Sequence, residues 1–241
     1  MELDESPILQ PASPPSQAPK IGDGRRALEV LANYLRGGLE PAPDHDSIES
    51  VRFAKVSREQ KLLIEWAKEN QKLKKSFPEG DGSGGEHIVH LDIKAGRYSK
   101  TTNQKGLGYG VAVGSYCRGA TPSEYLDRLS LQNELFNDDI RFEYVATRER
   151  LPVIVTSQRI AIGVPAQEAE IIAVMEDSGY EHIAPGTFYL ENRGLLVYDL
   201  HPRNAIKDPA GDIQMIDPVV QRVLPDFADF IRDHPESMRH I

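Results

Sequence analysis

The feature that most constrains the fold is a pair of short apolar runs that each end in an aspartate. The run LLVY is followed by Asp199, and the run IQMI is followed by Asp217. Short runs of this kind predict buried strands. A polar loop with Asn204 follows Asp199, and residues 205–216 predict a hairpin around the turn PAGD. We therefore expect the two aspartates and the asparagine to lie at strand ends around one small volume.

This group of side chains has the oxygen atoms that a hard cation needs. Mg²⁺ in proteins is usually held by one or two carboxylates, completed by water and phosphate oxygens. A spare carboxylate beside such an ion is suited to accept the proton of a hydroxyl group. On their own, loop aspartates often cap backbone amides, so the prediction depends on all three residues together.

Composition narrows the function classes. The chain has 241 residues and a net charge of −9, which disfavours general binding to nucleic acid or to an anionic membrane surface. One cysteine, Cys117, excludes an intramolecular disulfide framework and a cysteine-cage zinc site. No apolar run approaches the ~20 residues that span a bilayer. The first residues lack a basic start and an apolar core, so we expect a cytoplasmic protein.

The N-terminal third predicts little more than helices. Residues 1–22 are rich in Pro, Ser and Gln and predict a disordered arm. Helices are expected over residues 25–36 and from Ser57, where Gln60 completes a capping box. The segment PEGDGSGG then predicts a flexible joint, so residues 23–84 are interpreted as a helical extension with its linker.

From residue 85 the pattern is mixed. In order, it predicts a hairpin, a helix capped by Thr121, two strands, a second helix, two hairpins and a C-terminal helix starting at Val219. His87 and His90 fall on opposite faces of the first strand, which argues against a shared metal ion. The fold class is α+β with mainly antiparallel pairing.

The stretch Asp199-Leu200-His201-Pro202-Arg203-Asn204, followed by Ile216-Asp217, resembles the catalytic loop and metal-binding aspartate of the protein-kinase-like superfamily. The motif DLHPxN is similar to the catalytic-loop motif of the aminoglycoside and small-molecule phosphotransferase branch. The pieces GEHxV…GRxxK, EYLxRL…NxLF, SQxxxxG and DxHPRN…ID also resemble the small kinase domain of bacterial and phage polyvalent proteins. They cover roughly residues 85 to 224.

The resemblance implies a compact two-lobed kinase-like fold over residues 85–241 that uses ATP and Mg²⁺. A small lobe would cover about 85–156 and a short large lobe about 163–241. Asn204 and Asp217 would hold the metal, and Asp199 would orient or deprotonate the accepting hydroxyl. The acceptor would be a hydroxyl of a protein or of a small molecule.

In the part of the chain before Asp199, the resemblance implies a lysine on a strand that contacts the nucleotide phosphates, and Lys100 is the candidate. Its partner would be Glu124 or Glu134 on the following helix. Ser157 and Gln158 occupy the place of the segment that meets adenine, although Gln158 is equally an ordinary strand-end residue. The glycines of KGLGYG follow Lys100 rather than precede it, so we interpret them as a flexible connection.

Two positions depart from the superfamily pattern. Val197 stands where a histidine is usual, and Pro218-Val219 stands where Phe-Gly is usual. These departures keep an alternative open, in which the chain is a pseudokinase-type module that binds nucleotide or a partner without turnover. His201 is expected to make structural hydrogen bonds rather than to act as a base.

Overall fold

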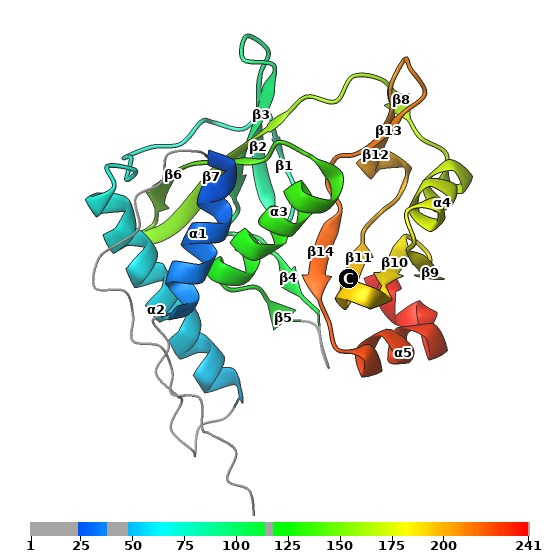
Figure 1. Cartoon of the computed structure of the whole chain (residues 1–241). Coiled ribbons are helices and arrows are strands. Elements are labelled where there is room, and N and C mark those ends of the chain that lie inside the picture. The colour runs from blue at the N-terminus through cyan, green and yellow to red at the C-terminus, as the bar shows by residue number, and fades with distance from the viewer. Residues whose placement is uncertain (1–23, 38–47, 114–117, 241) are drawn as a thin grey trace, which may run out of the picture.

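The computed structural model describes residues 24–37, 48–113 and 118–240 (Figure 1). The arm expected over residues 1–22 and Cys117 lie outside these ranges. Within them the chain is α+β with antiparallel sheets, which confirms the fold class predicted from the sequence. No described helix has the length and apolar character needed to cross a bilayer.

A five-stranded antiparallel sheet forms the first half of the molecule. Its strands, in spatial order, are β1 (Gly82–Ser83), β2 (His87–Asp92), β3 (Arg97–Thr102), β7 (Leu151–Arg159) and β6 (Arg141–Arg148). Lys100 lies opposite Val89 on β2 and Thr156 on β7, so these three side chains share one face of the sheet. β1 was expected to be part of a flexible joint. Instead Gly82 and Ser83 pair with Val89 and Ile88, because the glycines allow a tight return onto β2.

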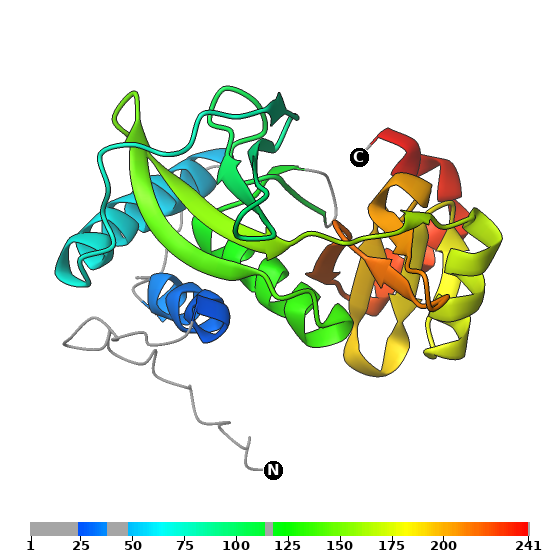
Figure 2. The same cartoon turned by 90° about the horizontal axis from the view of Figure 1, so that it is seen from above.

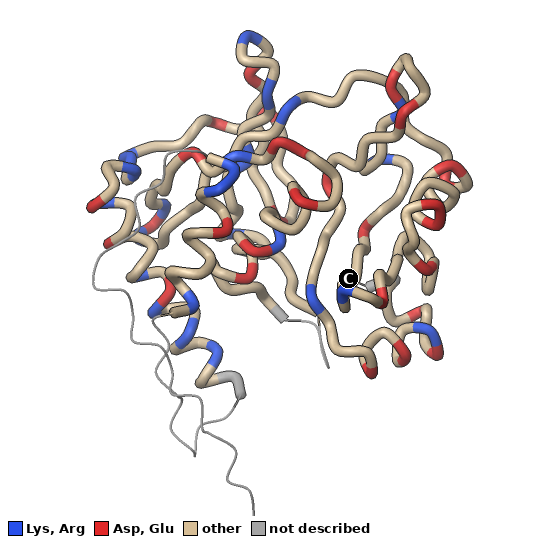
Figure 3. The backbone as a smooth tube through the Cα atoms, in the orientation of Figure 1, with Lys and Arg blue, Asp and Glu red and all other residues tan. Residues whose placement is uncertain are grey.

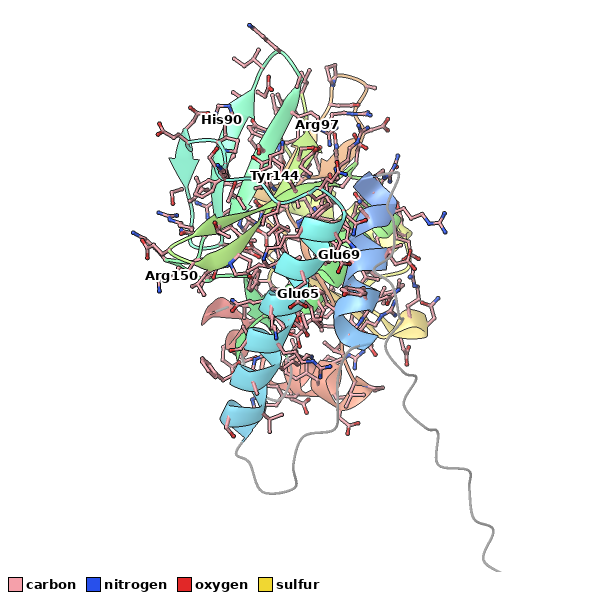
Figure 4. All side chains as sticks on the ribbon, turned by 90° about the vertical axis from the view of Figure 1, so that its left-hand side faces the viewer. Glu65, Glu69, His90, Arg97, Tyr144 and Arg150 are labelled. Carbon is pink, nitrogen blue, oxygen red and sulfur yellow. The ribbon has the colours of Figure 1, made fainter. Side chains whose placement is uncertain are left out.

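Helix α3 (Pro122–Phe136) packs on the sheet face that carries Lys100. Thr121 caps its N-terminus and Glu124 completes the capping box, as the sequence predicted for the cap. The helix ends at Asn137, which adopts the left-handed conformation. On this face, His87 Nε2 and the hydroxyl of Tyr125 are 2.9 Å apart. His90 lies on the opposite face and contacts Asp81, as the strand period predicted (Figure 4).

Helices α1 (Gly24–Gly37) and α2 (Ile48–Glu69) pack against α3 and against the same face of the sheet (Figure 1). The apolar side of α1 is fully buried, and α2 contributes Leu63 and Trp66 to the same core. Trp66 meets Phe142 of β6 edge to face, with the ring centroids 5.5 Å apart. α2 begins at Ile48 rather than at Ser57, so the capping box predicted at Ser57 is wrong. Ser57 is instead an interior residue of the helix.

The second half of the molecule contains two smaller sheets. The first is ordered β14 (Val219–Arg222), β11 (Leu195–Tyr198), β10 (Thr187–Leu190) and β9 (Glu181–Ala184), and the second β13 (Ile213–Met215), β12 (Ala205–Lys207) and β8 (Val164–Pro165). Helices α4 (Glu168–Asp177) and α5 (Pro225–Asp233) and the short helices η1 (Glu191–Arg193), η2 (Pro202–Asn204) and η3 (Pro235–His240) pack around them. The short pair β4 (Val111–Ala112) and β5 (Arg118–Gly119) lies near the start of α3.

The two halves are joined by the chain after β7, which crosses to the side of α4 and α5 (Figure 2). α3 also links them, because Leu131 packs into the core of the second half. The C-terminal helix was predicted from Val219, but residues 219–222 form β14 and the helix begins at Pro225. The run Val-Val-Gln-Arg pairs with β11, and its β-branched residues favour a strand at that place.

Candidate active site

Asp199 follows directly after β11, whose four residues are all buried. Its φ of 58° lies in the left-handed region, which is uncommon for a residue with a side chain. The next residue, Leu200, donates its N–H to the carbonyl of Gly186 at 3.1 Å, which fixes the start of the loop. The Asp199 side chain remains 54% exposed. The fold therefore holds this carboxylate at a rigid strand end and leaves it open to a ligand.

Asn204 joins the two aspartates. Its Nδ2 donates to the backbone carbonyl of Asp199 at 2.8 Å and to Asp199 Oδ2 at 3.2 Å, and it lies 3.5 Å from the carbonyl of Asp217. The carbonyl of Asn204 accepts the N–H of Ile216 at 2.9 Å. The hairpin of β12 and β13 thus returns Asp217 to the loop, as the sequence predicted. The structure brings Asp199, Asn204 and Asp217 together.

His201 holds the second oxygen of the Asp199 carboxylate. Its Nδ1 accepts the N–H of Arg203 at 3.2 Å, and its Nε2 lies 3.3 Å from Asp199 Oδ1. A neutral imidazole whose Nδ1 accepts must carry its proton on Nε2, which is the atom that faces the carboxylate. His201 was expected to be structural only, and this contact gives it a direct effect on Asp199.

Lys100 supplies a positive charge to the site. Its Nζ lies 3.1 Å from Asp217 Oδ1, and its side chain is only 14% exposed. Burial raises the pKa of the Asp217 carboxyl, but the charge of Lys100 and its hydrogen bond outweigh this and hold the pKa below its usual value. Burial also raises the pKa of Asp199. The neighbouring Asp217 adds to that increase, and His201 opposes it. Asp217 is therefore the more firmly ionised of the two carboxyl groups.

The two aspartates line one cavity of about 300 Å³. Gly84 and Gly85, from the turn between β1 and β2, line it as well. These glycines precede Lys100, whereas the glycines of KGLGYG follow it and pack closely beneath the turn. A Cβ at Gly106 would collide with the carbonyl of Gly85. Sequence reasoning missed Gly84 and Gly85, although a cluster of glycines one strand before the candidate lysine was a usable signal.

The prediction that a glutamate of α3 pairs with Lys100 is wrong. Glu124 lies in the first turn of the helix, where Oε2 accepts the N–H of Thr121 at 2.8 Å and pairs with Arg52 at 2.9 Å. Glu134 pairs with Arg193 at 2.7 Å. Both glutamates are turned away from β3 because the face of α3 toward the sheet carries other residues.

Arg128 is the charged residue that α3 turns toward the sheet. It is 4% exposed, pairs with Glu86 at the start of β2 and lines the same cavity as Asp217. The charges are the reverse of the expected arrangement, since the helix supplies the cation and the strand region supplies the carboxylate. Both residues lie in the pieces GEHxV and EYLxRL that carry the resemblance, but neither of them was given a role from the sequence.

Ser157 and Gln158 point to opposite faces of β7. Ser157 Oγ donates to Glu143 at 2.6 Å and accepts from Arg97 at 2.9 Å, on the face away from Lys100. Gln158 lies on the Lys100 face and donates to the carbonyl of Ile216 at 2.6 Å, directly before Asp217. Gln158 therefore links the large sheet to the candidate metal residue, and the Ser157 side chain is engaged elsewhere.

Within the described residues, carboxylate, histidine and cysteine side chains do not form a metal site by themselves. Among the residues that the structure describes, no group of three such side chains is close enough to hold an ion. The site instead presents two carboxylates and one carboxamide. This set suits a hard ion whose remaining ligands come from water and from a phosphate-bearing molecule.

The fold and the site are compatible with a kinase-like protein. Residues 56–223 match the family described as Serine/Threonine/Tyrosine Kinase found in polyvalent proteins, and the chain belongs to this family. The match begins within α2, before the residue 85 that the motif comparison indicated. No curated protein and no solved structure matches the chain.

Proposed function

We propose that the chain is a phosphotransferase that uses ATP and Mg²⁺ to phosphorylate a hydroxyl group. Asn204 and Asp217 would hold the metal, and Lys100 would neutralise phosphate charge. A bound magnesium nucleotide would supply the phosphoryl group and its charge stabilisation. Transfer of a phosphoryl group depends mainly on positioning and on electrostatic stabilisation, which these residues are suited to provide.

One observation carries the proposal. The amide of Asn204 contacts both Asp199 and the backbone of Asp217, while Lys100 pairs with Asp217 beside the same cavity. A structural turn needs the Asn–Asp contact alone. A structural turn does not explain why Lys100, a poorly exposed lysine of a different sheet, pairs with Asp217. It also does not explain why glycine backbone lines the cavity beside both aspartates. The combination supports a site for a polyanion with a divalent cation.

Asp199 is proposed as the residue that orients the acceptor. His201 and Asn204 each occupy one of its two oxygens, so the carboxylate has a fixed direction. Each oxygen keeps a further lone pair for the proton of an incoming hydroxyl. The raised pKa of Asp199 makes it a better proton acceptor than an ordinary aspartate once it is ionised.

The lobes follow from the same proposal. The five-stranded sheet and α3 would form the small lobe, and the elements from residue 163 onward the short large lobe. The nucleotide would lie between them. α1 and α2 share one apolar core with α3 and the sheet, which supports including them with the small lobe rather than as a separate extension.

A candidate place for the acceptor is a second cavity that Asp199 also lines. This cavity, of about 340 Å³, is lined by Asp199 and His201, with Glu168 and apolar side chains such as Met238 around them. α4, which begins at Glu168, has four acidic residues and no basic one (Figure 3). A hydroxyl group in this cavity would meet Asp199, which also lines the cavity that contains Asp217. The proposed acceptor is a hydroxyl group of a protein side chain or of a small molecule.

The test combines binding and transfer. Calorimetric titration of the full chain with ATP, with and without Mg²⁺, should show metal-dependent binding that Asp217→Asn abolishes. Asp199→Asn should retain binding and lose transfer of the γ-phosphate to the chain itself or to a Ser/Thr/Tyr peptide mixture. Equal ATP affinity in wild type and Asp217→Asn would refute the site.

The alternative function is nucleotide binding without turnover. Val197, which is fully buried in β11, stands where a histidine is usual in the superfamily, and Val219, the first residue of β14, stands where a glycine is usual. Metal-dependent ATP binding with no measurable transfer to any hydroxyl acceptor, including water, would favour this alternative.

A further inference from the structure

The partner of Lys100 in this structure is the residue that would hold the metal. A divalent cation at Asp217 would occupy the carboxylate that now pairs with the Lys100 ammonium. The nucleotide phosphates would then supply one anion for Lys100, and a fixed carboxylate of the protein close by would hold the ammonium in place, because a side chain that is 14% exposed has little solvent around it. α3 supplies none, since Glu124 and Glu134 are paired with arginines elsewhere.

A buried carboxylate with an open oxygen lies just beyond α3. Asp138 is fully buried, and its Oδ2 accepts a hydrogen bond from Gln132 of α3. Its Oδ1 is equally inaccessible and has no hydrogen-bond partner among residues 24–37, 48–113 and 118–240. Buried carboxylate oxygens are nearly always paired, so an unpaired one requires an explanation.

Asp138 and Lys100 lie on the same side of the large sheet. Lys100 is opposite Thr156, and the neighbouring pair Tyr98 and Gln158 shares their face. Gln158 is one of the polar neighbours of the Asp138 carboxyl and also bonds the carbonyl before Asp217. The charge of Lys100 lowers the pKa of Asp138, and that of Asp217 raises it, so Lys100 is within electrostatic range of both carboxylates.

We propose that Asp138 is the second partner of Lys100 and receives its ammonium when a metal–nucleotide complex occupies Asp217. The inference rests on the proposed nucleotide site. Asp138 would be a positioning residue, since it acts through Lys100 and does not touch the nucleotide. It would take the place of the helix glutamate that the kinase pattern led us to expect, because neither glutamate of α3 pairs with Lys100. The open Oδ1 is then the oxygen left available for Lys100.

A double-mutant cycle tests this coupling. Asp138→Asn keeps the shape of the side chain and removes its charge. It should weaken binding of Mg²⁺–ATP about tenfold, which corresponds to ~1.4 kcal/mol. In a Lys100→Met background the same change should have no effect, because the partner is gone. The matched control is Asp139→Asn. Asp139 is the adjacent buried carboxylate, but it pairs with Arg97 and Arg141, so this variant should leave ATP affinity unchanged.

Each outcome decides between the two proposals. Wild-type ATP affinity in Asp138→Asn, or an equal loss with and without Lys100, would overturn the role of Asp138 while leaving the nucleotide site intact. If the wild type shows no metal-dependent binding of ATP, both proposals are refuted. A structure of the wild type with Mg²⁺ and a non-hydrolysable ATP analogue gives a readout independent of variant folding. Lys100 Nζ should lie within hydrogen-bond distance of Asp138, and a Lys100 still on Asp217 would exclude the exchange.

Discussion

Glu59 of α2 accepts two hydrogen bonds from Ser123 at the start of α3, one from the backbone N–H at 2.8 Å and one from the hydroxyl at 2.9 Å. The Glu59 side chain is fully buried. It therefore serves as a carboxylate cap on the positive end of α3, supplied by a helix far away in the sequence. Arg52 reinforces the junction through its ion pair with Glu124. α2 thus fixes the helix whose other side faces the candidate active site.

The first prediction concerns this junction. Glu59→Ala removes two hydrogen bonds to a buried carboxylate and should lower the free energy of unfolding by roughly 2–3 kcal/mol. Glu65→Ala is the control, because Glu65 is an exposed glutamate of the same helix (Figure 4). It should change the stability by less than about 0.5 kcal/mol. Urea denaturation measures both, and equal stabilities of the two variants would contradict the role of Glu59.

The second prediction concerns the orientation of Asp199. His201→Ala removes the hydrogen bond to Oδ1 and should lower kcat about 10- to 100-fold, because a misdirected carboxylate loses the geometry of the acceptor. The KM for ATP should stay near the wild-type value, since His201 does not line the cavity that contains Asp217. Arg203→Ala is the control, as Arg203 meets His201 only through its backbone N–H. Steady-state phosphotransfer kinetics separate the two parameters, and a change in KM alone would be against this role.

The third prediction concerns the pH dependence of stability. Burial raises the pKa of Asp138 to about 6, against the opposing effects of the Gln158 and Gln132 amides. A carboxyl whose pKa is higher in the folded state binds protons more tightly there, so its ionisation disfavours folding. Asp138 should lower the stability of the unliganded wild type by a few kcal/mol as the pH rises from about 4 to about 6, in addition to the effects of the other carboxyl groups. Asp138→Asn should not show this loss. Denaturation curves across this range decide it, and parallel pH profiles of the two proteins would disprove the assignment.

How far the sequence predicted the site depends on whether the signal was local. Asp199, Asn204 and Asp217 are close in sequence, and their flanking strands are short apolar runs, so their convergence was predictable. Lys100 was found from its place before the helix. The partner of Lys100 was not predictable, because it depends on which side of α3 faces the sheet. Both glutamates lie on the wrong side of that helix.

The remaining misses also concern contacts distant in sequence. The segment containing Gly84 and Gly85 has the composition of a linker, and only its pairing with β2 makes it part of the cavity wall. Val219 begins an apolar run that fits a strand or a helix, and the neighbouring β11 decides in favour of the strand. Asp138 follows α3 without any motif, and its burial became apparent only in the folded chain.

The last prediction tests the glycine turn between β1 and β2. A Cβ at Gly84 would have only the carbonyl of His87 near it, at 3.9 Å, so the fold has room for a side chain. The same residue lines the cavity with Asp199 and Asp217, where a larger side chain would take the volume proposed for the phosphates. Gly84→Val should therefore raise the KM for ATP about tenfold, which corresponds to ~1.4 kcal/mol, with little change in unfolding temperature. Gly82→Ala is the control, because Gly82 lies in β1 just before this turn, has open space at its Cβ and does not line the cavity. Equal KM values for the two variants, measured with the phosphotransfer assay, would show that this turn does not cover the nucleotide.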